Sequence, residues 1–382
     1  MSVTLRKKLH ELAELSGVEE KTAEFVRNYL QELGPDQVVT GIGGHGVAAV
    51  FNGIEQGSGP RVLLRAELDA LPIPEWAESS YASKTPGVSH KCGHDGHMAM
   101  VLAVAEMLAA GAVKKGSVVL LFQPAEEIGQ GAGWVIQDEK FGALKPDWVF
   151  GLHNLPGFPL GQVILRRGVF ASASVGLKVR FEGATSHAAE PHQGRSPAQA
   201  VAQAIQALSA VPQFQTALHE ASKVTVIHAR LGAPAFGTSP GEAEVMATLR
   251  AHRGDVLNRI KDKCMSMLQA IATAENLKME SSWVEEFPST VNHDEAVDYV
   301  ETAAEHLGMD IARQDVPFPW SEDFGNYTKN IRGAFWGLGS GLNHPALHHP
   351  NYDFPDDLIE KGASLFSEIL RRTVGYTEVT AE

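Results

Sequence analysis

The chain has 382 residues, of which 44% are hydrophobic and 20% are charged, and this length suits a globular protein of two domains. Its formal net charge of -14 argues against nucleic-acid binding, because contacts with phosphate groups require clustered Lys and Arg. The sequence contains no run of about 18 apolar residues, so we expect no membrane span.

The first fifteen residues have the spacing of an amphipathic helix, with basic residues among the apolar positions. They lack the continuous apolar stretch of a signal peptide. Cys92 and Cys264 are the only cysteines, which excludes a framework of disulfides. We therefore expect a cytoplasmic protein in which Cys92 can act as a thiolate donor and Cys264 is a small buried hydrophobic residue.

The following part of the chain alternates helices with strands. Helical spacing predicts helices over 4–15, 19–33 and 98–108, and β-branched or leucine-rich runs predict strands over 62–64, 117–123 and 148–153. This alternation predicts an α/β domain with a mixed, largely parallel sheet between helices. Functional groups in such sheets gather beyond the carboxyl ends of the strands. Asp69, the Glu126–Glu127 pair and His153 lie at three such ends.

From about residue 174 the order of the predicted elements changes. Strands are expected over 175–181, 223–229, 244–251 and 277–283, and helices over 197–208 and 254–274. The resulting order, βαββαβ, is that of a small split α+β module. Because the α/β pattern resumes after Pro288, we expect residues 174–285 to form a domain inserted between 1–173 and 286–382.

The segment Cys92-Gly-His94-Asp95-Gly-His97 places a thiol, two imidazoles and a carboxylate directly before a predicted helix. Such a cluster of Cys and His is typical of a metal site. The alternative is a structural cysteine followed by polar residues that open the helix, with Asp95 as the N-cap.

Two adjacent glutamates, Glu126 and Glu127, follow the strand 117–123. Neighbouring side chains on an extended segment point in opposite directions, so one can face a metal and the other a substrate. The alternative is an ordinary solvated pair, but the apolar strand before it and the glycines after it weaken that interpretation. His153 could instead be a core histidine, and the His348–His349 pair could lie in a surface loop.

A catalytic tetrahedral metal keeps one position open, so it needs fewer protein ligands than the sequence offers. The candidate donors are Cys92, His94, Glu127, His153 and His348. Two divalent metals about 3.5–4 Å apart account for them best, because such a pair can share a water and bind a carbonyl oxygen. The mixture of thiolate, imidazole and carboxylate suits manganese, zinc, cobalt or nickel and leaves the metal's identity open.

Together, these segments resemble the metal-dependent aminoacylase, hippurate hydrolase and auxin-conjugate hydrolase branch of the co-catalytic metallopeptidases. The segments that carry the resemblance are Arg65-Ala-Glu-Leu-Asp69-Ala-Leu-Pro72, Cys92-Gly-His-Asp-Gly-His97, Phe122-Gln-Pro-Ala-Glu-Glu127, Gly151-Leu-His153, Ser186-His-Ala-Ala189, Ser321-Glu-Asp-Phe324 and Leu347-His-His-Pro350. They occur in the family's order along the whole chain. The resemblance implies an α/β catalytic domain interrupted by a lid that also forms a dimer.

The resemblance also implies a role for each site residue. Cys92 would bridge or join the two metals, and the other ligands would be His94, Glu127, His153 and His348, the last chosen over His349 because the family's unit is Leu-His-x-Pro. Glu126 would be the general base that activates a metal-bridging water. Asp69 would lie behind the metals and fix the orientation of an imidazole.

Three residues of the inserted domain are further candidates. His187 would contact the oxyanion from the partner subunit, and Arg250 would bind the free carboxylate of the substrate, unless it is an ordinary surface arginine. His192 is a possible second imidazole of the lid near the substrate. The chain has Gly237-Thr-Ser-Pro240 where relatives commonly carry an asparagine, so the resemblance does not extend to the polar contact of that asparagine.

We therefore expect an enzyme that hydrolyses the amide of an N-acyl amino acid, a small-molecule substrate, and that assembles as a homodimer or a higher homo-oligomer. One alternative is a dipeptidase or aminopeptidase with the same dinuclear site. Another is a non-catalytic module that binds such conjugates, which would not need Glu126. Histidines without neighbouring donors are expected at the surface; these are His10, His219, His252 and His306.

Overall fold

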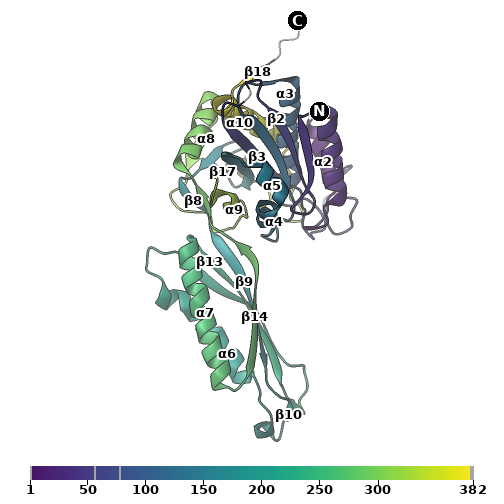
Figure 1. Ribbon diagram of the computed structural model, residues 1–382. Coiled ribbons are helices and arrows are strands. Elements are labelled where there is room, and N and C mark those ends of the chain that lie inside the picture. The colour runs from purple at the N-terminus through teal and green to yellow at the C-terminus, as the bar shows by residue number, and fades with distance from the viewer. Residues whose placement is uncertain (1, 56, 77–78, 379–382) are drawn as a thin grey trace. The chain divides into compact units, whose positions relative to one another are not determined.

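The computed structural model describes residues 2–55, 57–76 and 79–378, which form two compact units (Figure 1). The first unit comprises residues 1–170, 290–316 and 323–382. The second comprises residues 171–289 and 317–322. None of the described helices is both long and apolar enough to cross a membrane.

An eight-stranded sheet forms the centre of the first unit (Figure 1). In spatial order its strands are β1 (Gln37–Ile42), β2 (Gly46–Asn52), β5 (Ser117–Gln123), β3 (Arg61–Glu67), β6 (Trp148–Pro156), β17 (Arg332–Gly341), β7 (Val163–Leu165) and β16 (Ile311–Arg313). The central strands β5, β3, β6 and β17 are parallel, whereas β1, β2 and β7 each run antiparallel to a neighbour. The predicted mixed, largely parallel sheet is therefore confirmed.

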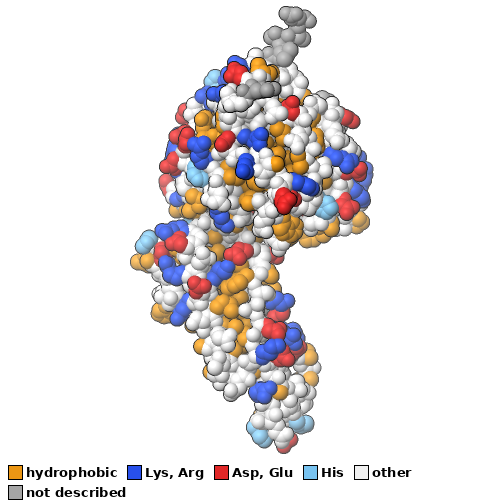
Figure 2. Space-filling model, viewed as in Figure 1, with side chains coloured by type: hydrophobic (Ala, Val, Ile, Leu, Met, Phe, Trp, Pro, Cys, Tyr) orange, Lys and Arg blue, Asp and Glu red, His pale blue; other side chains and the backbone are white. Residues whose placement is uncertain are grey.

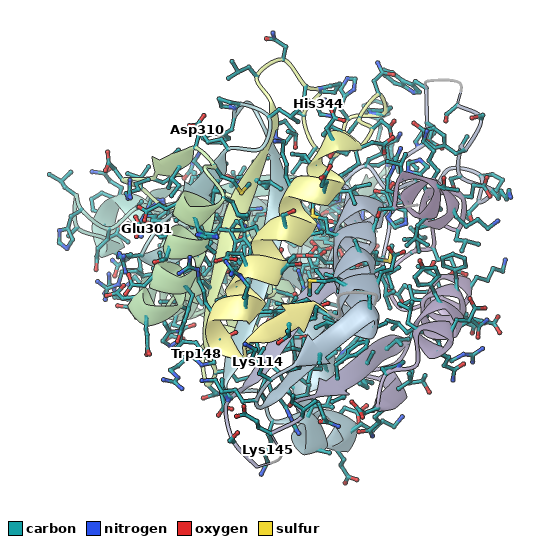
Figure 3. The ribbon with its side chains drawn as sticks, turned by 90° about the horizontal axis from the view of Figure 1, so that it is seen from above. Lys114, Lys145, Trp148, Glu301, Asp310 and His344 are labelled. Atoms are coloured by element: carbon teal, nitrogen blue, oxygen red, sulfur yellow. The ribbon has the colours of Figure 1, made fainter. Side chains whose placement is uncertain are left out.

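Helices cover both faces of this sheet. On one face a shared apolar core joins the strands to α1 (Ser2–Glu11), α2 (Glu20–Leu33), α3 (His94–Ala110), α8 (Asp294–His306) and α10 (Asp357–Thr373). Figure 3 shows α3 and α10 side by side on this face. The shorter helices α4 (Gly131–Gln137), α5 (Glu139–Leu144) and α9 (Gly325–Thr328) contact strands from the other side. Two short strand pairs complete the unit, β4 (Gly111–Val113) with β18 (Tyr376–Glu378) and β8 (Gly168–Ala171) with β15 (Thr290–Asn292).

The carboxyl ends of the central strands share one edge of the sheet. In Figure 3, Trp148 at the start of β6 and His344 just after the end of β17 lie at opposite edges. Every residue of β5 is buried, as expected for a strand with helices on both faces. A buried sheet of this kind holds the loops that follow its strands in fixed positions.

The second unit has the predicted βαββαβ order. Its elements are β9 (Ala173–Glu182), α6 (Ala198–Gln215), β11 (Ser222–Leu231), β13 (Glu242–Ala251), α7 (Gly254–Ala274) and β14 (Lys278–Phe287). The strands form an antiparallel sheet in the order β11-β13-β9-β14. A smaller pair, β10 (Ser186–His187) with β12 (Thr238–Ser239), and a 3-10 turn, η1 (Pro191–Gln193), complete this unit.

Burial alternates along β13, as expected for a sheet with helices on one face. The inward residues join a core with α6 and α7 that includes Cys264, which is fully buried as predicted. The other face of the sheet carries ion pairs such as Lys178–Glu244 and Arg180–Glu242. Figure 2 accordingly shows side chains of both charges interspersed over this unit.

Several predicted boundaries were wrong. The first helix ends at Glu11 instead of continuing to residue 15, because Leu15 forms a parallel bridge with Ala70. The helix predicted from residue 98 begins at His94, so the Cys-His motif forms its first turn. The strands β1 and β2 were not predicted.

Candidate metal centre

Polar side chains converge at the edge where the central strands of the first unit end. Asp69 follows β3, the glutamates Glu126 and Glu127 follow β5, and His153 lies within β6. Because β5, β3 and β6 are adjacent and parallel, their carboxyl ends meet at this edge. The helix α3 also begins here, with His94 as its first residue.

The turn between Cys92 and His94 requires a glycine. Gly93 has a φ of 93°, and a Cβ at this position would lie 2.6 Å from Oδ1 of Asn154. Glycine alone adopts the left-handed conformation at no steric cost and leaves room for the Asn154 amide. With this turn, Sγ of the buried Cys92 lies 3.3 Å from Nε2 of His153.

Hydrogen bonds determine which ring nitrogen His94 and His153 present to the site. Nδ1 of His94 donates to the backbone carbonyl of Asp69 at 2.8 Å, and Nδ1 of His153 donates to that of Asn154 at 2.9 Å. A carbonyl oxygen can only accept, so in the neutral imidazoles the lone pair is on Nε2. Histidines that bind a metal through one ring nitrogen usually donate a hydrogen bond to a carbonyl through the other.

The two glutamates lie next to His94. One carboxylate oxygen of Glu126 and one of Glu127 are each 3.9 Å from Nε2 of His94. The preceding residue, Ala125, has a φ of 54°, which alanine rarely adopts, and its N–H donates to the buried carboxylate of Glu19 at 2.8 Å. Backbone strain held in this way is typical of functional sites.

His348 reaches the cluster from the loop before α10. Its Nε2 lies 3.8 Å from a carboxylate oxygen of Glu127, and its φ of 64° is a second case of a strained residue other than glycine at this site. The backbone N–H of His348 donates to the carbonyl of Lys91 at 2.8 Å, which ties the loop to the Cys92 segment. His349 instead packs edge-on against Trp76.

These residues form overlapping groups whose potential ligand atoms lie within 4.8 Å of one another. The groups are Cys92, His94 and His153; Cys92, Glu127 and His348; and His94, Glu126 and Glu127. The structure thus brings together all the donors expected from the sequence. Cys92 belongs to two of these groups, as His94 and Glu127 do, and a thiolate in that position could be shared by two ions.

The electrostatics of the cluster suit divalent cations. Burial and the carboxylates of Glu127 and Glu126 raise the pKa of the Cys92 thiol well above its usual range, and a coordinated cation would deprotonate that thiol outright. Burial lowers the pKa of His153 well below its usual value, so this ring is neutral. Nε2 of His94 is buried and has no hydrogen-bond partner within the described part of the chain. A bound metal would satisfy that atom, so the residues fit the expected cofactor.

Asp69 connects two of the candidate ligands. One oxygen of its buried carboxylate accepts hydrogen bonds from the backbone N–H of Glu127 at 2.9 Å and from the Ser16 hydroxyl at 2.7 Å. The sequence suggested that this carboxylate orients an imidazole. In the structure the backbone carbonyl of Asp69 bonds to His94, and the nearer carboxylate oxygen is 3.6 Å from Nδ1.

A second buried layer lies behind the candidate ligands, and sequence reasoning did not identify it. Nδ1 of His97 bonds to Glu67 at 2.8 Å, and the ring of His97 lies edge-on against that of His153, with 4.8 Å between the centroids. Arg65 pairs with Glu67 and, at 2.7 Å, with Asp323. The available signal was the alternation of Arg65 and Glu67, which places both on one face of β3.

The N-terminal helix α1 also reaches the Cys-His motif. Nδ1 of His10 lies 2.7 Å from Oδ2 of Asp95, and Nη1 of Arg6 lies 3.1 Å from the same oxygen. Arg6 and His10 are fully buried, so the prediction that His10 lies at the surface was wrong. Burial opposes the charged form of His10, but Asp95 and Glu75 outweigh it and raise its pKa to about 9.

The lid candidates belong to the second unit, whereas all the candidate ligands belong to the first. His187 is exposed in β10, beside the Gly237–Pro240 segment, since Ala188 donates to the carbonyl of Gly237. His192 is exposed in η1. Arg250 is half-buried and lies one residue before the end of β13. Its guanidinium donates to Oγ of Ser321 at 3.0 Å and to the carbonyl of Pro319 at 3.2 Å.

Comparisons with known proteins agree with this picture. Residues 63–372 match the model of peptidase family M20/M25/M40. The chain is 32% identical to the N-acetyl-L-cysteine deacetylase of Bacillus subtilis (98% of this chain and 89% of the relative are covered) and 31% identical to the hippurate hydrolase of Campylobacter jejuni (96% and 94%). The structure is also similar to a crystal structure of the YXEP protein of Bacillus subtilis, which is described as a dinuclear metal-binding peptidase of family M20. The two superpose with a TM-score of 0.80 at 27% sequence identity, and the match covers 98% of this chain and 97% of the other.

Proposed function

The chain belongs to peptidase family M20/M25/M40, and from this premise we propose that it is a metal-dependent amidohydrolase that cleaves N-acyl amino acids into a carboxylic acid and a free amino acid. The observation that carries the proposal is the buried cluster of thiol, imidazole and carboxylate donors with Glu126 beside it. Relatives named as a deacetylase and a hippurate hydrolase support the same reaction class.

The proposed roles of the site residues follow from their chemistry. Cys92, His94, Glu127, His153 and His348 would hold two divalent ions, for which we propose manganese, zinc, cobalt or nickel. Such ions lower the pKa of a water and stabilise the oxyanion that forms from the amide carbonyl. Glu126 takes the proton from the attacking water and passes it to the leaving amine. Asp69 keeps the Glu127 backbone and the His94 ring in place.

The substrate's carboxylate would be bound by Arg250. This guanidinium is half-buried, and the acceptors around it, the Ser321 hydroxyl and the Pro319 carbonyl, are neutral. Burial lowers the pKa of Arg250 from its usual value, and the charge of a bound carboxylate would offset that effect. His192 stays a proposed second contact to the substrate. We place the protein in the cytoplasm, where the Cys92 thiol remains reduced.

A substrate panel tests the proposed reaction. We expect hydrolysis of acetyl, benzoyl or indoleacetyl amino acids with at least one of manganese, zinc, cobalt or nickel, and we expect a chelator to abolish it. Dipeptides should be poor substrates because a free α-amino group replaces the neutral acyl end. A preference for dipeptides would favour a peptidase, and binding of the conjugates without turnover would favour a binding module.

We also propose a symmetric homodimer in which His187 stabilises the oxyanion in the partner's site. Supporting this, His187 is exposed, and its Nδ1 accepts a local hydrogen bond from the backbone N–H of Ala189. Two-fold dimers are the commonest homo-oligomers.

Subunit mixing tests this arrangement. Loss of an oxyanion donor typically costs about 10²–10³ in turnover and loss of a general base about 10²–10⁴, so His187→Ala and Glu126→Gln chains should each be nearly inactive. Mixed dimers should regain activity, because one of their two sites has both groups intact. If mass measurement confirms the exchange of subunits and no activity returns, His187 does not act across subunits.

A further inference from the structure

The second unit contains a small cavity next to Arg250, at the ends of β9, β11 and β13. Its volume is about 240 Å³. The residues that line it are Ser172, Ala221, Ser222, Lys223, Arg250, Ala251, His252 and Pro319. Cavities that enclose drug-sized ligands have about 300–1,000 Å³, so this one suits a fragment such as the side chain of an amino acid.

Two cations line this cavity from adjacent strands. Lys223 of β11 is the register partner of Arg250 of β13, so both side chains emerge on the same face of the sheet. Directly opposite residues have Cβ atoms about 4.5–5.5 Å apart, close enough for both head groups to contact one small ligand. His252 adds an imidazole to the lining.

The positive charge of this pair is not compensated by neighbouring acids. Among the described residues no ion pair is found for Lys223 or Arg250. The acids nearest in sequence are engaged elsewhere, Asp255 by Arg253 at 2.7 Å and Glu220 by Arg259. On the rest of this sheet face, by contrast, Lys178 and Arg180 pair with glutamates. The cavity therefore carries two cations without an ion pair among the described residues, whereas Lys178 and Arg180 on the same sheet are paired.

We propose that this cavity binds a dicarboxylic amino-acid moiety, one carboxylate on Arg250 and the second on Lys223. The inference rests on the proposed function and deepens it: N-acyl glutamate and N-acyl aspartate would be preferred over N-acyl derivatives of neutral amino acids. A guanidinium binds one carboxylate through a planar fork, and the flexible ammonium of Lys223 adapts to the position of the second. Arg250 alone would not distinguish glutamate from glutamine, whereas Lys223 would.

The test compares N-acetylglutamate with N-acetylglutamine, which has the same shape but lacks the second charge. Hydrogen bonds to charged groups predict a preference for the glutamate compound of about tenfold to a hundredfold in kcat/KM, mainly through KM. Lys223→Met should bring the ratio close to one, and Lys223→Arg should restore it. Lys263→Met, which removes a lysine from α7 of the same unit, should keep the wild-type ratio. Raising the salt concentration should lower the preference, because the pair is partly exposed.

Calorimetry separates this inference from the proposed function. If neither compound is hydrolysed, the proposed function fails, and binding of the two intact compounds to the metal-loaded wild type and Lys223→Met still measures the same ratio. A wild-type enzyme without a preference for glutamate, or a Lys223→Met variant that keeps it, would overturn the assignment. So would inhibition by inorganic phosphate as strong as that by glutarate, which would reveal a general anion site.

Discussion

Replacement of Glu126 by glutamine is expected to lower kcat by about 10²–10⁴-fold while leaving the metal content unchanged. Glu126 is 5% exposed, with a carboxylate oxygen 3.9 Å from Nε2 of His94. Glutamine has nearly the same shape but cannot take a proton from the attacking water. The chemical step should therefore be lost, while the substrate still binds with a similar KM. Turnover measured alongside the metal content of the purified variant gives the result.

Two matched variants make this experiment specific. Glu127→Gln alters a proposed ligand and should lower the metal content as well as the activity, since Glu127 lies 3.8 Å from His348. Glu139→Gln, in α5, makes the same chemical change away from the ligand cluster, so it should lower neither the metal content nor the activity. If Glu126→Gln retained more than half of the wild-type activity, Glu126 would not be the base.

The part of the site that could be predicted depends on local patterns and strand order. Asp69, Glu127 and His153 follow or end apolar runs, and parallel central strands bring such ends together. His348 could be predicted as a ligand only from the family resemblance. It lies in a loop more than 190 positions beyond His153, and the sequence around it does not indicate which residues it will contact. The left-handed backbone conformation of His348, like that of Ala125, also cannot be predicted from the type of residue.

The buried charges behind the motif were missed for a different reason. Arg6 and His10 lie one helical turn apart in an amphipathic pattern, where polar residues usually face solvent. Here they face inward because Asp95 needs partners: its Oδ2 receives both side chains, and its Oδ1 accepts the backbone N–H of Gly96 at 3.0 Å. A buried carboxylate is tolerated only with such compensation, and its partners are 85 and 89 residues away in sequence. The spacing of residues along the sequence does not indicate pairs that lie so far apart in the chain.

The second prediction with a large expected effect concerns Cys92. Cys92→Ala removes a donor that belongs to two groups of potential ligands, so the bound metal should fall below two equivalents per chain. Activity should fall by more than the roughly 10–100-fold that loss of a residue supporting a ligand typically costs, because a ligand itself is lost. Metal analysis of the dialysed variant and its turnover at saturating added metal measure the two effects separately.

The other cysteine provides the control for this experiment. Cys264 is also fully buried, but it lies in the apolar core of the second unit, and burial raises the pKa of its thiol to about 12, as for an inert buried residue. Cys264→Ala should therefore keep both metals and the activity. Its only effect should be a loss of stability from poorer packing of the core. If Cys92→Ala still bound two equivalents of metal, the cysteine would have to be structural. The centre would then consist of imidazoles and carboxylates alone, with the Cys92 thiol held 3.3 Å from His153 only to fix that ring.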